Sequence, residues 1–226
     1  MAELLNQIIP DVVARSDQLW RAFWETIQMV GISGAISLVL GIPYGVLLFT
    51  TREGGVLQNR PVNFILGRVC DFFRSIPFIL LAILLLGLSR LVVGVAIGVR
   101  GAIIPLVFGT VPFLGRQTES ALAEVPAGLI EAAETIGSSP WEIIWRVYLR
   151  EAVPGITRGV TITIVSLINF TAVAGTLGAG GLGNFAIMYG HSKNLPQITW
   201  TVILIIVVLV SAVQFVGGYI AKKATH

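Results

Sequence analysis

The stretch that decides the fold is LIEAAETIGSSPWEIIWRVYL, residues 129–149, which lies near the middle of a mostly apolar chain. Gly137 stands where a glycine ends a helix in the left-handed conformation. Ser139 and Pro140 suit the N-cap and first position of a new helix, and Glu142 completes a capping box. The pattern predicts two short helices joined by a rigid elbow at residues 137–139. The second helix is expected to have one apolar face, formed at helical spacing by Trp141, Ile144, Trp145 and Tyr148.

Charge-free runs flank this polar segment on both sides. The chain of 226 residues is 55% hydrophobic and 12% charged, whereas soluble domains are about 25% charged. Runs of about 20 apolar residues are long enough to cross a bilayer as helices. The sequence therefore predicts an all-α integral membrane protein with a loop at residues 87–100. Its five transmembrane helices are expected at about residues 27–50, 63–86, 101–121, 156–177 and 198–221.

Prolines and charges modify two of these spans. Pro105 and Pro112 are expected to interrupt the third span, because proline lacks the amide hydrogen that a helix needs. In the second span, Arg68, Asp71 and Arg74 recur every three residues, so they share one helical face. Charges at hydrocarbon depth are costly. We therefore expect Asp71 to lie between the two arginines, either in a structural ion cluster or as part of a gate.

The distribution of basic residues predicts the orientation of the chain. Five spans put the termini on opposite sides, and a cytoplasmic C-terminus places ten lysines and arginines inside against five outside. This asymmetry follows the positive-inside rule. We expect an extracytoplasmic amphipathic segment at residues 1–25 and a single transmembrane domain at 26–221. The polar segment 122–152 and the tail 222–226 are then cytoplasmic.

Sequence motifs typical of enzymes are absent or lack their context. Residues 178–183, GAGGLG, match G-x-G-x-x-G, but a transmembrane segment precedes them and position 203 holds isoleucine where a dinucleotide site needs an acid. The chain contains no Gly-Lys dipeptide, no G-x-S-x-G and only two histidines. We therefore expect no catalytic site, no metal and no cofactor in this chain. The net charge of +3 is scattered, so no nucleic-acid partner is indicated.

Two further groups of residues are candidates for function. A half-polar stripe in the fourth span either lines a translocation path or hydrogen-bonds neighbouring helices, and it consists of Ser166, Asn169, Phe170 and Val173. The glycine-rich stretch after that span requires a tight backbone bend. This outer turn either serves a gate or a partner, or is a simple turn, and its glycines are Gly178, Gly180, Gly181 and Gly183.

The polar segment resembles a known family. Glu131-Ala132-Ala133, Gly137 and Val147-Tyr148-Leu149 are similar to the EAA motif of ABC importer permeases, which reads E-A-A, three residues, G, nine residues, I-x-L-P. Val147 and Arg150 replace the isoleucine and the proline of that motif. Five longer stretches resemble the permease subunit of methionine importers: GIPYGVLL (41–48), FRSIPFILL (73–81), IIPLVFGTVPFLGR (103–116), EVPAGLIEAAETIG (124–137) and GAGGLGNFAIMYG (178–190).

This resemblance implies a permease with the methionine-importer fold in the bacterial inner membrane. Such permeases form a homodimer, bind two cytoplasmic ATPase subunits and receive substrate from a separate extracytoplasmic binding protein. ATP and Mg are bound by the ATPase subunits, whose closure shifts the permease between inward-open and outward-open states. The elbow would then be the coupling helix that docks on the ATPase. The implied contact residues are Glu131, Ala132, Ala133 and Gly137, with Ser138 and Ser139 at the tip.

Two alternatives remain open at the level of sequence. The permease could serve another small amino acid or organic solute, which uptake competition would reveal. An ion-coupled secondary transporter is a different class, in which inverted repeats and broken helices surround internal ionisable groups. No repeat is evident in this chain, and an ion-coupled transporter leaves the capped elbow unexplained.

Overall fold

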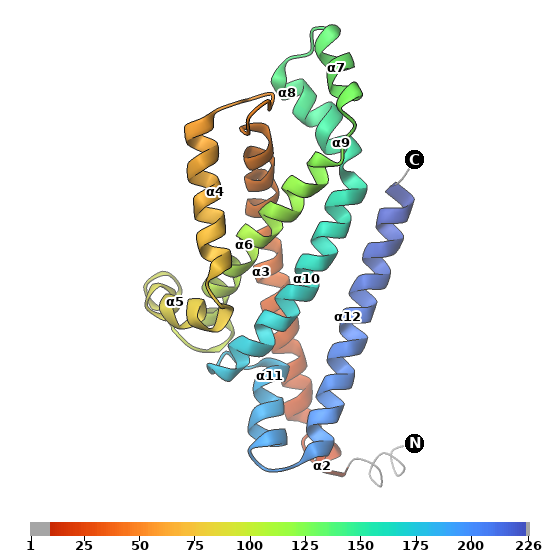
Figure 1. Ribbon diagram of the computed structural model, residues 1–226. Coiled ribbons are helices and arrows are strands. Elements are labelled where there is room, and N and C mark those ends of the chain that lie inside the picture. Colours follow the sequence, from red (N-terminus) through yellow and green to blue (C-terminus); the bar gives the residue numbers. More distant parts are fainter. Residues whose placement is uncertain (1–9, 225–226) are drawn as a thin grey trace. The chain divides into compact units, whose positions relative to one another are not determined.

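The computed structural model describes residues 10–224, which form helices joined by short connections (Figure 1). The chain folds as two compact units. The described part of the first comprises residues 10–35, 77–107 and 164–212, and that of the second comprises residues 36–76, 108–163 and 213–224. The α-helices are α2 (Pro10–Val13), α3 (Ser16–Thr50), α4 (Arg60–Ser75), α5 (Phe78–Val93), α6 (Gly98–Ala123), α7 (Ala127–Thr135), α8 (Pro140–Glu142), α9 (Leu149–Glu151), α10 (Val153–Thr176), α11 (Gly181–Phe185) and α12 (Pro196–Ala224). Two π-helices complete the chain, η1 (Ile143–Tyr148) and η2 (Ala186–His191).

The five predicted spans are present as helices. α3, α6, α10 and α12 are each long and apolar enough to cross a membrane, and α4 with α5 passes the same test as a bent pair. The prediction of an all-α membrane protein with five spans is therefore confirmed when the bent pair counts as one span. All four long helices begin before their predicted spans, and α6 and α12 also end after them, whereas α3 and α10 end within one residue of the predicted position.

The second predicted span, 63–86, is not one helix. α4 ends at Ser75, and α5 starts at Phe78 after Ile76 and Pro77 in extended conformation, with ψ angles of 123° and 133°. Proline disfavours the helical conformation of the residue before it, so the helix stops at that point. The predicted loop at 87–100 is also wrong in its first half. α5 runs to Val93 and ends at a left-handed glycine, Gly94, with φ 79°.

Prolines do not interrupt the third span. Pro105 and Pro112 both lie inside the unbroken helix α6, so the predicted interruption is wrong. Bundled helices tolerate proline because neighbouring groups satisfy the backbone that it frees. In the second unit, the Cys70 thiol on α4 donates to the carbonyl oxygen of Pro112 at 3.3 Å.

The N-terminal segment expected at residues 1–25 continues directly into the first span. Residues 1–9 lie outside the described part of the chain, as do residues 225–226 of the predicted tail. From Ser16 onward the chain is already α3. Ala22 is buried there in an apolar cluster with Leu182, Phe185 and Ile198. The start of α3 therefore belongs to the packed first unit, because its apolar face covers α11 and the beginning of α12.

In the second unit, small residues allow α3 and α6 to pack closely. A Cβ atom added at Gly45 would overlap the carbonyl oxygen of Gly115 and lie 2.5 Å from the Thr118 Cβ. A Cβ atom added at Gly41 would lie 2.9 Å from Cδ2 of Leu114. Membrane helices that approach this closely depend on small-xxx-small spacing, since lipid provides no hydrophobic force between helices. Gly41 and Gly45 supply that spacing.

Candidate functional site

The elbow of the polar segment has the predicted backbone geometry. Gly137 has a φ of 85°, in the left-handed region. Its N–H donates to the Glu134 carbonyl oxygen at 2.9 Å, and the Ser138 N–H donates to that of Ala133 at 3.0 Å. These two bonds form a Schellman motif, which satisfies the last carbonyls of α7. The predicted helix end at Gly137 is confirmed.

The start of the second helix carries a complete capping box. The Ser139 hydroxyl accepts from the Glu142 N–H, and a Glu142 carboxylate oxygen accepts from the Ser139 N–H at 3.0 Å. Pro140 follows the cap at the first helical position. The bonds from the Ser139 backbone and hydroxyl, together with the nearby Arg146, lower the pKa of Glu142 from its ordinary value of 4.5. The lowered pKa means that the cap contributes above pH 4.5 and is lost as pH falls through the lower folded value.

Removing the cap should loosen the elbow locally. In Ser139→Ala, the N–H of Glu142 loses its acceptor, so we expect faster hydrogen–deuterium exchange in the first turn after Pro140. Exchange in α7 should stay unchanged, because its C-terminal bonds do not involve Ser139. Ser138→Ala is the matched control, because the hydroxyl of Ser138 makes no hydrogen bond among the described residues. Equal exchange in the two variants would contradict the role of the capping box.

The base of the polar segment is packed against the ends of two long helices. Ile130 of α7 and Ile143 and Tyr148 of η1 are buried with Phe49 at the end of α3 and Leu122 at the end of α6. The rings of Phe49 and Tyr148 meet edge to face at 5.0 Å between centroids. Burial raises the pKa of the Tyr148 hydroxyl. The elbow therefore projects from a rigid apolar base, as α7 and α8 do in Figure 1.

The tip of the elbow exposes large apolar side chains. Ile136 is 84% exposed, and Trp141 and Trp145 are 61% and 68% exposed. The four residues predicted to form one apolar face are divided: Ile144 and Tyr148 are buried, whereas the two tryptophans are exposed. Residues 143–148 form a π-helix, whose wider turns bond residue i to i+5. Ile143, Ile144 and Tyr148 face the base, whereas the tryptophans point outward.

The six residues that were expected to contact an ATPase lie on the same hairpin as these exposed apolar side chains. Glu131, Ala132, Gly137 and Ser139 are exposed, and Ser138 is half-buried. Ala133 packs partly against the apolar base. The structure thus brings the six residues together on one short hairpin. Ile136 and the two tryptophans were missed as candidates, because helical spacing predicts an apolar face but not which of its residues another segment covers.

The stripe predicted to line a translocation path lies on α10 in the first unit. Asn169 is exposed, whereas Ser166, Phe170 and Val173 are half-buried. The Phe170 ring stacks on that of Phe78, the first residue of α5, with centroids 4.5 Å apart. Among the described residues, the Ser166 and Asn169 side chains make no hydrogen bond to a neighbouring helix. This leaves their polar groups available to water, substrate or another chain.

The glycine-rich turn of the first unit bends through left-handed backbone. Gly178, Gly180 and Gly181 have φ angles of 87°, 86° and 79°. A Glu25 carboxylate oxygen accepts from the Gly181 N–H at 2.8 Å, and the Thr26 hydroxyl accepts from the Leu182 N–H at 2.9 Å. These bonds tie the turn to α3. Gly183 lies within α11, where an added Cβ would overlap the backbone of Ala172.

A hollow of about 510 Å³ opens beside this turn. Its lining mixes charged, amide and apolar groups, among them Gln18, Arg21, Glu25, Asn184, Met188 and Tyr189. The Arg21 guanidinium is paired with Glu25 at 3.0 Å. The turn is therefore one wall of a polar hollow at the end of the first unit.

The charged residues of the second span pair differently from the prediction. Asp71 of α4 bonds Arg116 of α6 at 2.7 Å, and Arg116 also bonds Glu119 at 2.7 Å. Arg68 lies over the ring of Phe64, 5.0 Å from its centroid. An ion cluster is present, but the expected placement of Asp71 between its own helix neighbours is wrong. Residues that are three apart on one helix cannot reveal a partner that another helix supplies.

Comparison with known proteins agrees with this geometry. The family of binding-protein-dependent transport system inner membrane components matches residues 37–226. The probable D-methionine transport system permease protein MetI of Vibrio cholerae is 43% identical over 221 residues, covering 98% of each chain. The methionine import system permease protein MetP of Bacillus subtilis is 41% identical over 205 residues, covering 91% of this chain and 92% of the relative.

Solved structures show the same relationship. A chain of the MetNI methionine ABC transporter in an inward-facing conformation has a TM-score of 0.92 and 39% identity, and the match covers 94% of this chain and 99% of that chain. A chain of an amino acid ABC transporter that is 13% identical has a TM-score of 0.78, which shows the fold alone. The family match, the relatives and the exposed elbow agree, and the chain belongs to the inner membrane components of binding-protein-dependent transport systems.

Proposed function

We propose that this chain is the permease subunit of an ATP-driven importer for methionine. Relatives named as methionine permeases cover nearly its whole length, and the similar solved chain comes from a methionine transporter. The assembly would contain two copies of this chain, two cytoplasmic ATPase subunits that bind ATP and Mg, and an extracytoplasmic binding protein. This chain would provide the route and carry out no chemistry.

The observation that carries the proposal is the exposed apolar tip on a rigid base. Ile136, Trp141 and Trp145 expose large apolar side chains beside Glu131 and Ala132. Exposed aromatic and aliphatic side chains flanked by polar groups are typical of protein interfaces. A base packed against the ends of α3 and α6 transmits motion, because packed cores do not deform continuously. We propose that this tip docks in the ATPase subunit.

The orientation follows from the same assignment. An ATPase acts in the cytoplasm, so the elbow and the C-terminus would be cytoplasmic and the N-terminus outside, in agreement with the excess of basic residues on that side. The outer turn and its hollow would then face the binding protein or form part of the outer gate. The membrane would be the bacterial inner membrane. Ser166, Asn169, Phe170 and Val173 would line the route on α10.

Co-purification and uptake test the proposal together. The chain is co-expressed with candidate ATPase and binding-protein subunits, and the purified complex is reconstituted in liposomes. We expect the ATPase to co-purify, and we expect ATP-dependent uptake of labelled methionine only when the binding protein is present. An ATPase that never co-purifies would contradict the coupling assignment. Uptake that excess unlabelled methionine fails to inhibit would contradict the assignment of methionine as the substrate.

A second candidate substrate is another small amino acid or organic solute. The solved amino acid transporter with 13% identity has the same fold, so the fold does not select the substrate. Competition of methionine uptake by a panel of unlabelled amino acids separates the two substrates. Stronger inhibition by another amino acid than by methionine would favour this second candidate.

A further inference from the structure

Helix α4 has three different faces. One face carries Cys70, the residue of α4 that is buried within the described chain. The second face is apolar and exposed, and it is formed by Val62, Ile65, Val69 and Phe72. The third face is a mixed charged stripe at positions i, i+4, i+7 and i+11, formed by Phe64, Arg68, Asp71 and Ser75. At 100° per residue, each member of this stripe lies within about 60° of the others around the helix axis.

The charged stripe reaches deep along the span. Arg60 begins α4 and pairs with Glu53 in the polar loop before it, and α4 together with α5 is long and apolar enough to cross a membrane as a bent pair. With a rise of about 1.5 Å per residue, Arg68 lies roughly 12 Å and Asp71 roughly 16 Å beyond Arg60. Arg68 and Asp71 therefore lie more than two helical turns beyond the charged start of a helix pair that is long and apolar enough to cross the membrane.

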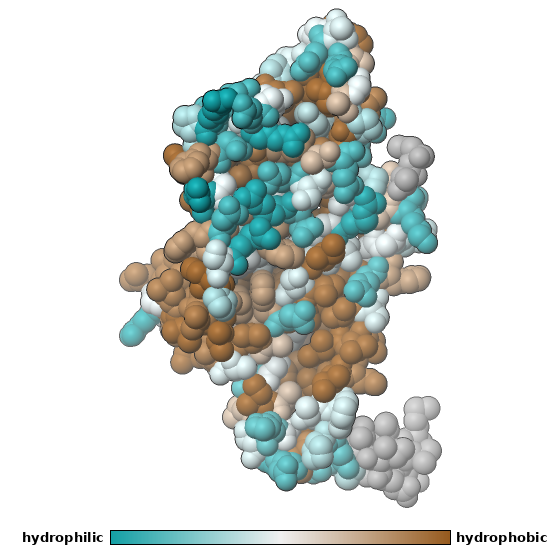
Figure 2. All heavy atoms as spheres, viewed as in Figure 1, coloured by the Kyte–Doolittle hydropathy of each residue, from teal (hydrophilic) through white to brown (hydrophobic). Residues whose placement is uncertain are grey.

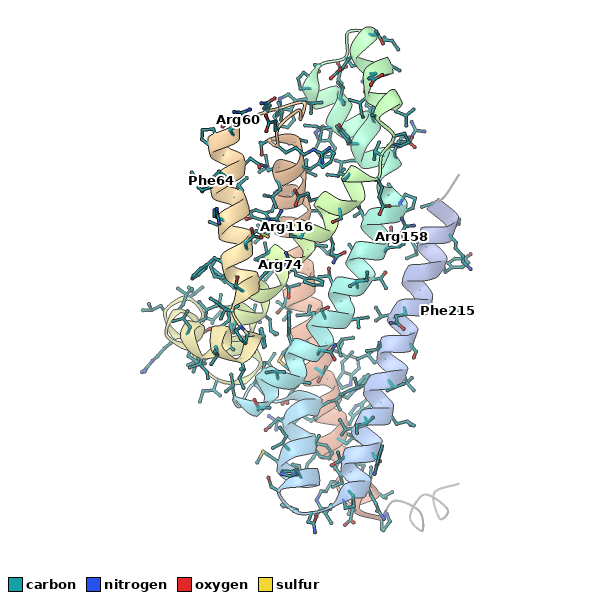
Figure 3. The ribbon with its side chains drawn as sticks, in the orientation of Figure 1. Arg60, Phe64, Arg74, Arg116, Arg158 and Phe215 are labelled. Atoms are coloured by element: carbon teal, nitrogen blue, oxygen red, sulfur yellow. The ribbon has the colours of Figure 1, made fainter. Side chains whose placement is uncertain are left out.

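The pairing of Asp71 leaves one side of its carboxylate open. Asp71 bonds Arg116, yet its side chain remains 56% exposed. A groove of about 520 Å³ runs along this part of α4 and is lined by Arg68, Val69, Asp71, Phe72, Phe73 and Ser75. In Figure 2, polar residues cover the face of the second unit at the level where Figure 3 labels Arg74 and Arg116. A charged surface on a membrane-spanning helix is not compatible with lipid.

We propose that the charged stripe of α4 lines the aqueous substrate route, on the side that a second copy of this chain faces. The inference rests on the proposed transport function and deepens it by naming route residues on α4, whereas the earlier candidates lie on α10. Ionisable groups inside a membrane face water, protein or a substrate pathway. The second copy closes the route and keeps lipid from the stripe.

The chemistry of the stripe suits a zwitterionic amino acid. The Arg68 guanidinium has unused N–H donors for a carboxylate. The Asp71 carboxylate, with its exposed side, has acceptor capacity for an ammonium group. The neighbouring Phe64 ring supplies apolar surface for a side chain. Because Arg68 and Asp71 carry opposite charges one helical turn apart, the stripe binds neither cations nor anions strongly. A passage for a net-neutral substrate requires this balance.

Cysteine accessibility tests the stripe with a matched control on the same helix. Phe64 and Ile65 are 62% and 60% exposed in the chain, so they differ mainly in the face they occupy. Ser75 is a second stripe position, and it lines the groove. Single variants Phe64→Cys and Ser75→Cys and the control Ile65→Cys are made in the complete transporter. Inverted membrane vesicles are treated with a membrane-impermeant thiol reagent, and the unmodified chain, whose Cys70 is buried, gives the background.

We expect Phe64→Cys and Ser75→Cys to react many times faster than Ile65→Cys. Thiols react as thiolates in water, so only the stripe that faces the route should be modified. A rate for Ile65→Cys that equals or exceeds the rates of the two stripe variants would overturn the proposal. Labelling needs no substrate. Failure of methionine uptake in the unmodified transporter would therefore contradict the proposed function and leave the labelling result valid.

A charge variant tests the contact with substrate. Arg68→Gln removes the guanidinium that would pair with the substrate carboxylate and leaves the Asp71–Arg116 pair in place, so the ATPase should still co-purify. We expect methionine uptake to fall severalfold, and Arg68→Lys to recover part of it. Uptake equal to that of the unmodified transporter in Arg68→Gln would overturn the role of Arg68 in substrate passage.

Discussion

The variant Ile136→Asp is expected to abolish ATP-driven uptake while the membrane portion stays folded. Ile136 is 84% exposed at the tip of the elbow, so aspartate there meets water in the free chain. Surface substitutions of this kind change stability by about 0.5 kcal/mol or less. In the proposed complex, however, the side chain would lie in an apolar contact with the ATPase. A buried, unpaired carboxylate at a central contact costs about 2 kcal/mol or more, which is roughly 30-fold in affinity.

The measurement is co-purification of the ATPase with the variant, followed by uptake in liposomes. Ile136→Val is the matched control, because it keeps an apolar side chain at the same position and should bind and transport normally. Thermal unfolding in detergent should be the same for both variants. Normal uptake by Ile136→Asp would contradict the placement of Ile136 in the coupling contact.

The variant Gly45→Ala is expected to destabilise the packing of α3 on α6 in the second unit. The new Cβ would overlap the Gly115 carbonyl oxygen and stand 2.5 Å from the Thr118 Cβ, and backbone cannot shift cheaply to make room. Overpacking of this kind costs about 1–3 kcal/mol. Because the displaced atom belongs to the backbone, we expect a loss near the upper end of that range, seen as lower yield and a lower Tm in detergent.

Gly31→Ala is the matched control on the same helix. A Cβ added at Gly31 would meet nothing within 4 Å. Alanine also favours helix over glycine by about 0.5–1 kcal/mol, so the Tm of this variant should be unchanged or slightly higher. Equal losses in Gly31→Ala and Gly45→Ala would show that the close approach of α3 and α6 does not limit stability.

The local sequence predicted the elbow well. Gly137, Ser139, Pro140 and Glu142 specify a helix end and a helix start through bonds between residues at most five apart. Such bonds form wherever the chain lies, so their pattern is readable without knowledge of the fold. The family resemblance of the same residues was confirmed by relatives along nearly the whole chain, which removes the ion-coupled alternative.

Features that depend on a partner across the fold escaped the sequence. The pairing of Asp71 with Arg116 joins residues 45 positions apart, and the small residues that let α3 meet α6 become significant only when both helices are present. The exposure of Trp145 accompanies a π-helix in which Ile143 and Tyr148 both reach the apolar base.

Sequence by itself determined the number of apolar spans, the capped elbow and the family, because hydropathy, helix caps and motifs are read from neighbouring residues. Only the tertiary structure decided that the helix breaks at Pro77 but not at Pro105 or Pro112, which elbow side chains face outward and which arginine holds Asp71. Those outcomes depend on how side chains from distant segments fill a shared volume and on which partners they meet there, and no local pattern carries that information.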